Sequence, residues 1–568
     1  MKRFFVVGAA LGALMIPAAA SAQDGHDHGC LDETCTVVSL IQDADPATPG
    51  WQGTQTPSYG EWGFNLAGRD TSVNPGDDFF RYAGGLAFDQ IQIPSDRTSY
   101  GSFALLRELS DNRMMALVEG LAARNDLTPG SDEAKIRDAY RSYMDEARIE
   151  ALDDQPLQPF LAAVRAADTH EKMAVLMGRQ GTIGASIFGT GISVDAKDPN
   201  RYVVSMGQGG LGLPNRDYYV DARYADKKEK YQAYIARMLE MIGWDDPAGN
   251  AAAVLAFEQK IAEAHWTTIQ SRDRDRTYNE YTPASLAAEL SGFDLGAYLE
   301  SAELGSVDRL IVRQNTAMPK IAAAYAETPV AVLQAWQAFH MTDDAAGRLS
   351  RRFADAQWEF RSRDLSGQPE QRSRDKRGVS YAEGALNEAA GRLYAAEYFP
   401  PESKAKMEEL VANLRRALSH RIDNLTWMGP ETKAQAQDKL AKFEVRIGYP
   451  EKWRDYSALE IRPDDLFGNS ERLSQFNWRR QRDRLDQPVD RTEWGMMPQI
   501  VNASYNSVFN TITFPGRHSA AALLRSGRRS GGELRRHRRG DRPRDRPRLR
   551  RSGLQVRRRR RAARLVDA

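Results

Sequence analysis

Residues 103–124 read Phe103-Ala-Leu-Leu-Arg-Glu-Leu-Ser-Asp-Asn-Arg-Met-Met-Ala-Leu-Val-Glu-Gly-Leu-Ala-Ala-Arg124. Leucine, methionine and valine recur in this stretch at intervals of three to four residues, which is the period of one face of an α-helix. The stretch therefore predicts a helix, and its pattern indicates what to look for in the rest of the chain.

The same helical period runs through most of the chain before residue 500. It is found in residues 132–148, 224–242, 251–264, 329–341, 381–397, 403–428 and 432–443. Two regions read instead as strands: residues 185–206, with a turn at Asp195-Ala-Lys-Asp-Pro-Asn200, and the alternating residues 501–514. The glycine-rich residues 207–214 lack the setting of a phosphate-binding loop and predict a chain reversal. The sequence thus predicts a mainly α fold with a small β component.

The N-terminus has the three parts of a secretory signal peptide. Lys2 and Arg3 precede an apolar run over residues 4–20, and Ala20-Ser-Ala22 offers small residues for cleavage. A membrane anchor is the alternative, but glycine and proline interrupt the run, which is short for a membrane span. We expect cleavage near Ala22, a secreted or periplasmic protein, and no transmembrane segment in the mature chain.

The only two cysteines, Cys30 and Cys35, follow the predicted cleavage site. In an oxidising compartment they can close a small local disulfide within a flexible N-terminal segment, residues 23–60. His26 and His28 stand beside them, which also suits a metal cluster, although nothing in the sequence fixes its geometry. The remainder of the chain must be stabilised by burial and not by disulfides.

The net charge of +1 conceals two regions of opposite sign. Residues 517–568 contain 20 arginines, no lysine and 4 acidic residues, whereas residues 1–516 carry 58 basic and 73 acidic side chains. A segment so basic and so poor in large apolar side chains cannot form a core, so we expect a disordered tail. Arginine without lysine or aromatic residues is unlike a nucleic-acid-binding arm, and an exported chain does not meet nucleic acid. We expect no nucleic-acid partner.

A series of motifs occurs in a fixed order over about 450 residues. They are Gly63-Phe-Asn-Leu-Ala-Gly-Arg-Asp-Thr-Ser-Val-Asn-Pro-Gly-Asp-Asp-Phe-Phe-Arg-Tyr82, Ile93-Pro-Ser-Asp-Arg-Thr-Ser-Tyr-Gly-Ser-Phe103, Gly210-Leu-Gly-Leu-Pro-Asn-Arg-Asp-Tyr-Tyr219, Arg392-Leu-Tyr394, Leu425-Thr-Trp-Met428, Glu431-Thr-Lys-Ala-Gln-Ala-Gln-Asp-Lys-Leu440, Ile447-Gly-Tyr-Pro450 and Glu493-Trp-Gly-Met-Met-Pro-Gln-Ile-Val-Asn-Ala-Ser-Tyr-Asn506. Together they resemble the neprilysin and endothelin-converting-enzyme family of zinc metalloendopeptidases, which includes exported bacterial members. The resemblance stops at Phe514-Pro-Gly516.

The resemblance implies a large helical domain that caps a thermolysin-like catalytic domain, around a cavity that admits peptides and not folded proteins. It assigns residues 61–485 to the mainly helical N-terminal domain. It assigns residues 486–516 to the first strands of an incomplete catalytic domain. Residues 1–22 are then the signal peptide, and residues 517–568 are an arginine-rich tail.

The resemblance also implies an edge strand for substrate at Val501-Asn-Ala-Ser-Tyr505. Carried over, the Asn502 side chain hydrogen-bonds the backbone of an extended peptide, and Ala503 does so through its main chain. An exposed strand edge offers unpaired amide and carbonyl groups, so such binding tolerates many peptide sequences. Ser504 stands where many relatives carry an aromatic or other residue, which leaves the subsite preference open. The alternative interpretation is that Asn502 only satisfies a local turn.

Family members hold zinc with a helical His-Glu-x-x-His and a later glutamate, and the first glutamate acts as general base. None of the eight histidines of this chain has the i, i+4 spacing of that signature. The lone histidines His340 and His420 are interpreted as solvent-facing or satisfied core residues. We therefore assign no catalytic residue and no metal ligand, and we expect no zinc at a catalytic site of this chain.

The arginine-rich tail carries a trace of that signature in the adjacent reading frame. When the last two bases of each codon join the first base of the next, Gly540-Asp-Arg-Pro-Arg-Asp-Arg-Pro-Arg-Leu-Arg-Arg-Ser-Gly553 can encode Val-Ile-Gly-His-Glu-Ile-Gly-His-Gly-Phe-Asp-Asp-Gln. The first histidine codon would join Pro543 to Arg544, and the second would join Pro547 to Arg548. The hypothesis is a frameshift near Gly516, in the gene or in its sequencing.

The intact protein is thus expected to be a metalloendopeptidase that hydrolyses oligopeptides, whereas the chain as written is expected to be inactive. One alternative is a binding module that captures extended peptides without cutting them. Another is a basic-tailed protein that binds acidic surfaces with steep salt dependence. The sequence carries no indication of the preferred peptides or of the oligomeric state.

Overall fold

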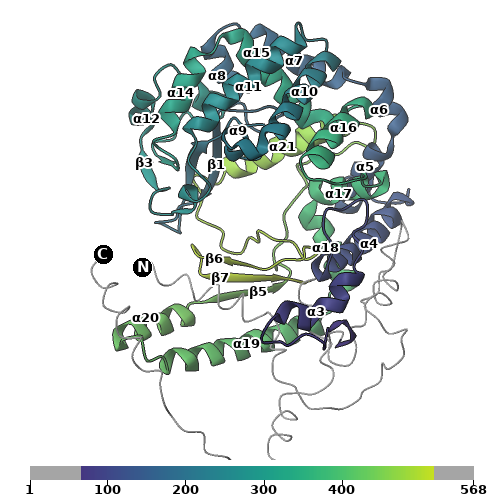
Figure 1. The fold of residues 1–568 in the computed structure, drawn as a ribbon, viewed down its shortest axis with the longest axis vertical. Helices are drawn as coiled ribbons and strands as arrows, with labels where there is room; N and C mark the ends of the chain where they lie inside the picture. The colour runs from purple at the N-terminus through teal and green to yellow at the C-terminus, as the bar shows by residue number, and fades with distance from the viewer. Residues whose placement is uncertain (1–65, 517–568) are drawn as a thin grey trace, which may run out of the picture. The chain divides into compact units, whose positions relative to one another are not determined.

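The computed structural model describes residues 66–516, and helices predominate among them (Figure 1). The predicted signal peptide, Cys30 and Cys35, His26 and His28, and the arginine-rich tail lie outside the described residues. The helices are α3 (Phe79–Gln90), α4 (Ser102–Ala122), α5 (Asp132–Met144), α6 (Glu146–Leu152), α7 (Gln158–Ala166), α8 (His170–Gly178), α9 (Asp217–Val220), α10 (Ala225–Met241), α11 (Pro247–Ala264), α12 (Pro283–Glu289), α13 (Leu295–Ser301), α14 (Met318–Glu327), α15 (Val330–Ala345), α16 (Arg351–Trp358), α17 (Arg374–Ala385), α18 (Asn387–Tyr398), α19 (Pro401–Asp423), α20 (Pro430–Ala441) and α21 (Leu466–Arg482). A 3-10 turn, η1 (Leu66–Gly68), precedes α3, and a π-helix, η6 (Glu359–Asp364), follows α16.

Within residues 66–516, seven strands form two small sheets. The first, sheet A, has the order β1–β2–β4–β3, and the second, sheet B, has the order β5–β7–β6. The strands are β1 (Phe188–Val194), β2 (Tyr202–Gln208), β3 (Asn279–Tyr281), β4 (Leu310–Val312), β5 (Glu444–Gly448), β6 (Ser504–Asn506) and β7 (Thr511–Pro515). The predicted mainly α fold with a small β component is confirmed.

The period of apolar residues predicted where helices occur, but it did not predict where one helix ends and the next begins. The helix predicted over residues 103–124 is α4, but the run over 132–148 is divided into α5 and α6 at Asp145. The Asp145 carboxylate accepts a hydrogen bond from the amide of Arg148 and so caps the second helix. The run over 381–397 is likewise divided between α17 and α18 at Leu386. Among the described helices, none is both long and apolar enough to cross a bilayer.

Sheet A forms around a buried aspartate. β1 and β2 make the predicted hairpin, β2 runs parallel to β4, and β3 is antiparallel to β4. Asp195 at the hairpin turn accepts hydrogen bonds from the Lys197 amide, the Tyr278 hydroxyl and the Arg309 guanidinium, at 2.9, 2.8 and 2.7 Å. Burial alone would raise the pKa of Asp195, but these three donors together lower it to about 2. The turn is thereby fixed to the segments that enter β3 and β4.

Two apolar cores hold the helices together. The larger core lies between sheet A and helices α7–α8, α10–α11 and α13–α15, where Trp336, Phe339 and Tyr325 are fully buried. The smaller core joins α4, α5, α17 and α18, and contains Met114, Ile136 and Tyr394. Figure 1 shows the helices of the larger core above sheet B, α4 and α18 of the smaller core beside it, and α19 and α20 below it. Close packing of this kind makes the helical region a rigid support for the elements attached to it.

Candidate functional site

Sheet B carries the predicted peptide-binding segment at one edge. β7 is parallel to β5 and antiparallel to β6. Positions aligned across neighbouring strands share a face of a sheet, so Ile447, Ile512 and Phe514 form one apolar face. This face packs against Met407 and Val411 of α19. Among the described residues β6 pairs only with β7, so the outer edge of β6 has no strand beside it.

Asn502 and Ala503 lie immediately before β6, where the chain approaches this edge. The Ala503 side chain packs against the apolar cluster of sheet B, so its peptide group is the part available to a ligand. The Asn502 side chain is exposed, and its Oδ1 accepts a hydrogen bond of 2.9 Å from the Ala503 amide. The two groups assigned to peptide binding therefore bind each other in this structure. Their role in binding peptide stays a prediction.

The alternating residues 501–514 form a hairpin and not one continuous strand. The turn between β6 and β7 depends on asparagine, because Asn506 Oδ1 accepts hydrogen bonds from the amides of Val508 and Phe509 at 2.9 and 3.3 Å. Asn510 takes a φ of 55°, in the left-handed region that asparagine tolerates. The turn contains no glycine or proline, which is why the sequence pattern did not reveal it.

An irregular segment links α21 to β6 and contains the predicted domain boundary between residues 485 and 486. Glu493 in this segment accepts hydrogen bonds from Arg480 and Arg484 of the α21 end, while its carbonyl accepts one of 2.6 Å from Arg446 of β5. Burial lowers the pKa of both Arg480 and Arg446. At the turn between β6 and β7, the Arg274 guanidinium donates a hydrogen bond to the Ser507 hydroxyl. Sheet B is thus fastened to the helical region at both ends of the candidate edge.

The histidines within the described residues are held singly. No group of three or more histidine, cysteine, aspartate or glutamate side chains in residues 66–516 is placed to hold a metal ion. His265 Nε2 lies 3.0 Å from the Gly209 carbonyl oxygen, and burial lowers the pKa of this imidazole to about 4. His420 is exposed on α19, whereas His340 is buried. The described residues therefore do not fit a zinc site of the kind that the resemblance implies.

A buried carboxylate in the helical region was missed by sequence reasoning. Glu258 of α11 is fully buried and accepts hydrogen bonds from the hydroxyls of Tyr219 (2.6 Å) and Tyr231 (3.0 Å). The indole of Trp336 donates at 3.1 Å, and His340 Nε2 lies at 2.7 Å. Burial and the neighbouring Glu258 raise the pKa of both tyrosines well above the usual value. We name these five residues the Glu258 cluster.

The Glu258 cluster holds the glycine-rich turn that follows β2. The Gly212 amide donates to Glu258 at 3.3 Å and to the Tyr219 hydroxyl at 3.1 Å, and the Gly212 carbonyl accepts from Arg361 of η6. A Cβ atom at residue 212 would lie 1.7 Å from the Tyr231 hydroxyl oxygen, so only glycine fits. The predicted chain reversal at residues 207–214 is therefore built around a buried polar centre.

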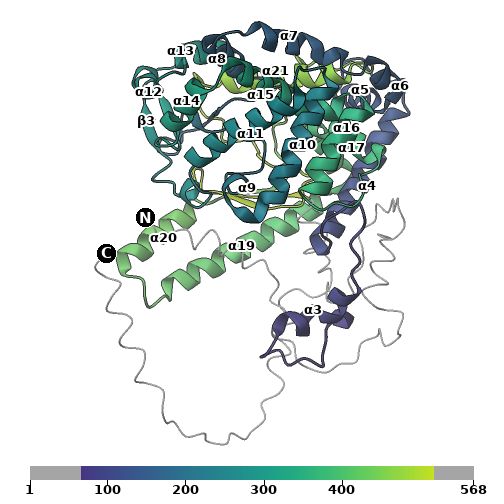
Figure 2. The same ribbon diagram turned by 45° about the horizontal axis from the view of Figure 1, so that its top comes forward.

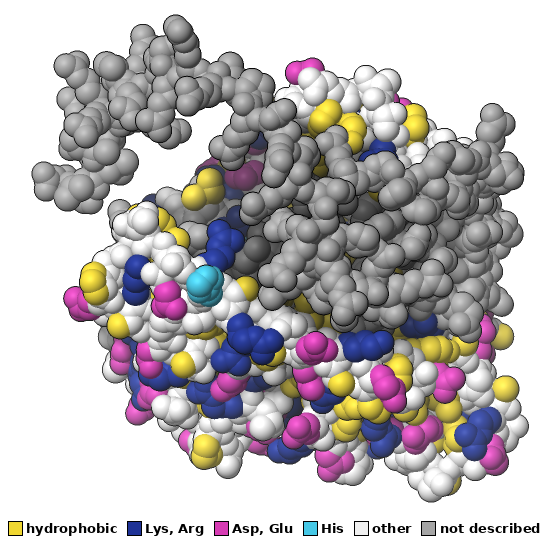
Figure 3. Space-filling model, turned by 90° about the horizontal axis from the view of Figure 1, so that it is seen from below, with side chains coloured by type: hydrophobic (Ala, Val, Ile, Leu, Met, Phe, Trp, Pro, Cys, Tyr) yellow, Lys and Arg dark blue, Asp and Glu magenta, His cyan; other side chains and the backbone are white. Residues whose placement is uncertain are grey.

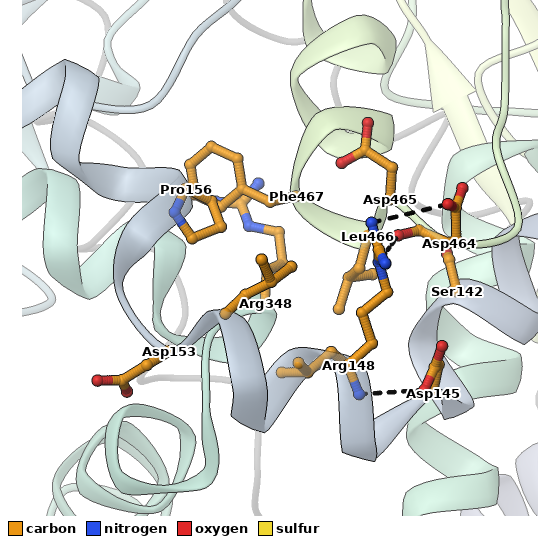
Figure 4. Close-up of a pocket in the computed structure, with 12 residues that line it drawn as sticks. Ser142, Asp145, Arg148, Asp153, Pro156, Arg348, Asp464, Asp465, Leu466 and Phe467 are labelled. Carbon is orange, nitrogen blue, oxygen red and sulfur yellow. Dashed lines mark hydrogen bonds and ion pairs between the residues drawn. The ribbon is translucent and has the colours of Figure 1, made fainter.

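A small pocket lies elsewhere, between α5, α6 and the start of α21 (Figure 4). It is lined by Asp145, Arg148, Asp464 and Phe467, among others, and its volume is about 30 Å³. That volume suits one or two water molecules and not a peptide side chain. The Arg148 guanidinium donates a hydrogen bond of 2.5 Å to the Asp464 carbonyl oxygen, so a polar contact links α6 to the segment before α21 at this pocket.

The surface drawn in Figure 3 shows basic, acidic and apolar side chains interspersed over the described residues. Mixed charges of this kind do not focus a field of one sign. The interpretation as a protein that binds acidic surfaces rests on the arginines of residues 517–568, which lie outside the described part of the chain, so it stays a prediction.

Comparison with known proteins places these features in a family context. A family model described as Peptidase family M13 matches residues 75–450. Endothelin-converting enzyme 1 of Homo sapiens is 26% identical over 477 residues, which cover 79% of this chain and 61% of that protein. Endothelin-converting enzyme-like 1 of Mus musculus is also 26% identical, over 80% of this chain and 61% of the relative. The chain therefore spans about 61% of the length of these curated relatives.

The solved structures agree with the sequence relatives. The zinc metalloprotease Zmp1 of Mycobacterium tuberculosis, in complex with an inhibitor, matches with a TM-score of 0.77 and 34% identity, over 82% of this chain and 70% of that one. The same enzyme in an open state matches with a TM-score of 0.68 and 36% identity, over 78% of this chain and 70% of that one. PepO of Lactobacillus rhamnosis, at 21% identity, over 78% of this chain and 71% of that one, has the same fold with a TM-score of 0.70.

Proposed function

Because the chain belongs to peptidase family M13, we propose that it is the larger, helical part of an exported zinc metalloendopeptidase that acts on oligopeptides. Its own contribution to that activity is to hold an extended peptide along the outer edge of β6. Asn502 binds the peptide backbone through its side chain, and Ala503 binds it through its main chain. The chain as written captures peptide without cutting it.

The observation that carries this proposal is the outer edge of β6 on a supported sheet, an edge that has no neighbouring strand within residues 66–516. Sheet B is packed on α19 by its apolar face and is fastened to the helical region through Glu493 and Ser507. A strand that is held rigidly and is unpaired on one side can receive a second strand through main-chain hydrogen bonds. Affinity then comes from the backbone of the peptide and depends little on its sequence.

Zinc is the cofactor of the intact enzyme in this proposal, where it would polarise the scissile carbonyl and activate a water molecule. The described residues offer no ligand set for it. We therefore assign no step of the reaction to residues 66–516 beyond the positioning of the peptide. Export follows from the predicted signal peptide, whose removal near Ala22 would give a mature chain that starts at Gln23.

The missing ligands are proposed to lie in the adjacent reading frame beyond Gly516. The repeated Asp-Arg-Pro-Arg of residues 541–548 is the pattern that a repeated Ile-Gly-His produces in that frame. Sequencing the DNA across codons 510–568 is the direct check, and the expected reading is His-Glu-Ile-Gly-His one base out of register. Codons that spell anything else in that frame would remove this explanation of the tail.

Replacing Asn502 by alanine should weaken the binding of an unstructured oligopeptide about tenfold, because one hydrogen bond to the peptide backbone is lost. Fluorescence polarisation with a labelled hexapeptide, on the full chain, measures the dissociation constant. A peptide with a single N-methyl group should also bind more weakly than its parent, since a backbone donor is removed.

Asn125→Ala is the matched control, because Asn125 is an exposed asparagine on the loop after α4, far in sequence from sheet B. Equal affinities for the parent chain and the Asn502→Ala variant would contradict the proposed role of Asn502. So would an equal loss in the Asn125→Ala variant, which would point to a general effect of the substitution.

A further inference from the structure

A loop that links α11 to β3 meets sheet B at the end of the candidate edge. The loop, residues 266–277, contains three arginines, Arg272, Arg274 and Arg276, and we name it the basic loop. The Arg274 guanidinium donates a hydrogen bond to the hydroxyl of Ser507, which is the first residue after β6. A guanidinium is therefore held at the point where an extended peptide would pass beyond the edge of β6.

The basic loop is firmly supported by the helical region. Gln208, the last residue of β2, accepts a hydrogen bond of 2.7 Å from the Trp266 amide and donates one of 3.2 Å to the Trp266 carbonyl. The Arg276 guanidinium lies over the Trp266 ring, 4.5 Å from its centroid. The Asp273 carboxylate accepts hydrogen bonds from the amides of Asp275 and Arg276 at 3.1 and 3.3 Å. A loop that is ordered in advance binds a ligand without a large cost in conformational entropy.

The exposed side chains of the basic loop suit a carboxylate ligand. Arg272 and Arg274 are exposed, and Arg272 forms no ion pair with any residue in the part of the chain that the structure describes. Asp273 directs its carboxylate at the amides of its own turn, so Asp275 is the opposing charge that remains exposed. Guanidinium groups bind carboxylates through two parallel N–H donors, which gives both affinity and a preferred geometry.

The position of the basic loop sets the length of peptide that can reach it. Figure 2 shows β3, which the loop enters, at the margin of the helical region beside α12, as does Figure 1. A strand advances about 3.4 Å per residue, so the level of Asn502 and that of Ser507 are about 17 Å apart. A peptide bound at Asn502 therefore needs about six residues to place a side chain beside Arg274.

We propose that the basic loop is a subsite of the candidate edge and selects peptides with an acidic side chain, which Arg272 and Arg274 bind next to Ser507. The ligand is an extended peptide of about six residues or more, with aspartate or glutamate at the end that meets the loop. This inference rests on the proposed peptide-binding function and adds a preference at one position. Backbone pairing with β6 supplies the affinity, and the basic loop supplies the discrimination.

Competition measured by fluorescence polarisation tests the inference on the full chain. Hexapeptides of alanine, serine and threonine, acetylated and amidated at their ends, compete with a labelled neutral hexapeptide. Each carries glutamate or glutamine at its first or its last position. Glutamate at one end only should bind about three- to fivefold more tightly than glutamine, the effect of an exposed ion pair. The difference should fade in about 0.5 M salt, which screens exposed charges.

Three variants connect the preference to the basic loop. In the Arg272→Gln/Arg274→Gln double variant, the ratio of glutamate to glutamine affinity should fall to about one, because both guanidinium groups are removed. Asp275→Asn should widen the preference, since the opposing charge is removed. Arg351→Gln is the matched control, because the Arg351 side chain is 68% exposed on α16 and pairs with Glu146 of α6.

Equal binding of the glutamate and glutamine peptides by the parent chain would overturn the inference and leave the proposed function intact. Failure of every peptide to bind would remove both. A preference that is equal at the two ends, or that survives in the double variant, would assign the effect to the 20 arginines of residues 517–568, which every variant retains, and would overturn the inference. An equal loss in Arg351→Gln would do the same by pointing to the overall charge.

Discussion

Replacing Glu258 by alanine is expected to lower the free energy of unfolding by about 3–5 kcal/mol, the range for removing one member of a buried, hydrogen-bonded pair. The carboxylate is fully buried and faces donors from Tyr219, Tyr231 and Trp336. Alanine leaves each donor without its partner in a place that water does not reach, and three orphaned donors at about 1–3 kcal/mol each account for a loss of this size. Urea denaturation followed by circular dichroism measures the change through the shift in midpoint.

Glu263→Ala is the matched control on the same helix. Glu263 is exposed, and its carboxylate accepts one hydrogen bond from Gln259, so its removal should change the stability by no more than about 0.5 kcal/mol. A Glu258→Ala variant as stable as this control would show that Glu258 is not the centre of the buried cluster.

The second large loss of stability is expected from a steric clash at Gly212. Gly212→Ala should destabilise the protein by about 2–4 kcal/mol, because the added methyl group forces the buried Tyr231 away from Glu258. Without movement the new Cβ would lie 1.7 Å from the Tyr231 oxygen and 2.7 Å from its ring carbon Cζ. Differential scanning calorimetry of the variant and the parent chain measures the loss as a lowered melting temperature.

Gly495→Ala is the control for this substitution. Gly495 is exposed in the segment between α21 and β6, and a Cβ atom there meets nothing within 4 Å. A change within about 0.5 kcal/mol is expected. The two large substitutions share Tyr231, so the double variant should lose less than the sum of the two single losses. Full additivity would place Gly212 and Glu258 in separate networks.

The helices could be predicted because burial imposes a period on the sequence, and that period survives in each amphipathic run. The ends of helices are set by local hydrogen bonds that carry no period. Asp145 shows this, since it ends α5 and caps α6 within a run whose apolar spacing continues unbroken. The β6–β7 turn was missed for a related reason, because asparagine side chains build it without glycine or proline.

The candidate edge was found through a family motif, since nothing in the spacing of Asn502 and Ala503 alone indicates a ligand. The structure adds that β6 is at the edge of sheet B among the described strands and that the Ala503 side chain packs against the apolar cluster of that sheet. The Glu258 cluster could not be predicted from the sequence. Its members come from four separate segments of the chain, and a single glutamate in an alanine-rich helix looks like a solvated charge until the tertiary contacts are known.

The hydrogen bond between the Asn502 side chain and the Ala503 amide has a consequence for the protein in the absence of peptide. A free strand edge is a template for aggregation, since any extended chain can add to it. Asn502 occupies one of the amides that such a chain would need, and it does so reversibly because the bond is local and exposed. A ligand must therefore compete with an intramolecular cap before it can add to the sheet. The same residue that is proposed to recognise peptides would thus keep the empty edge from pairing with other copies of the protein.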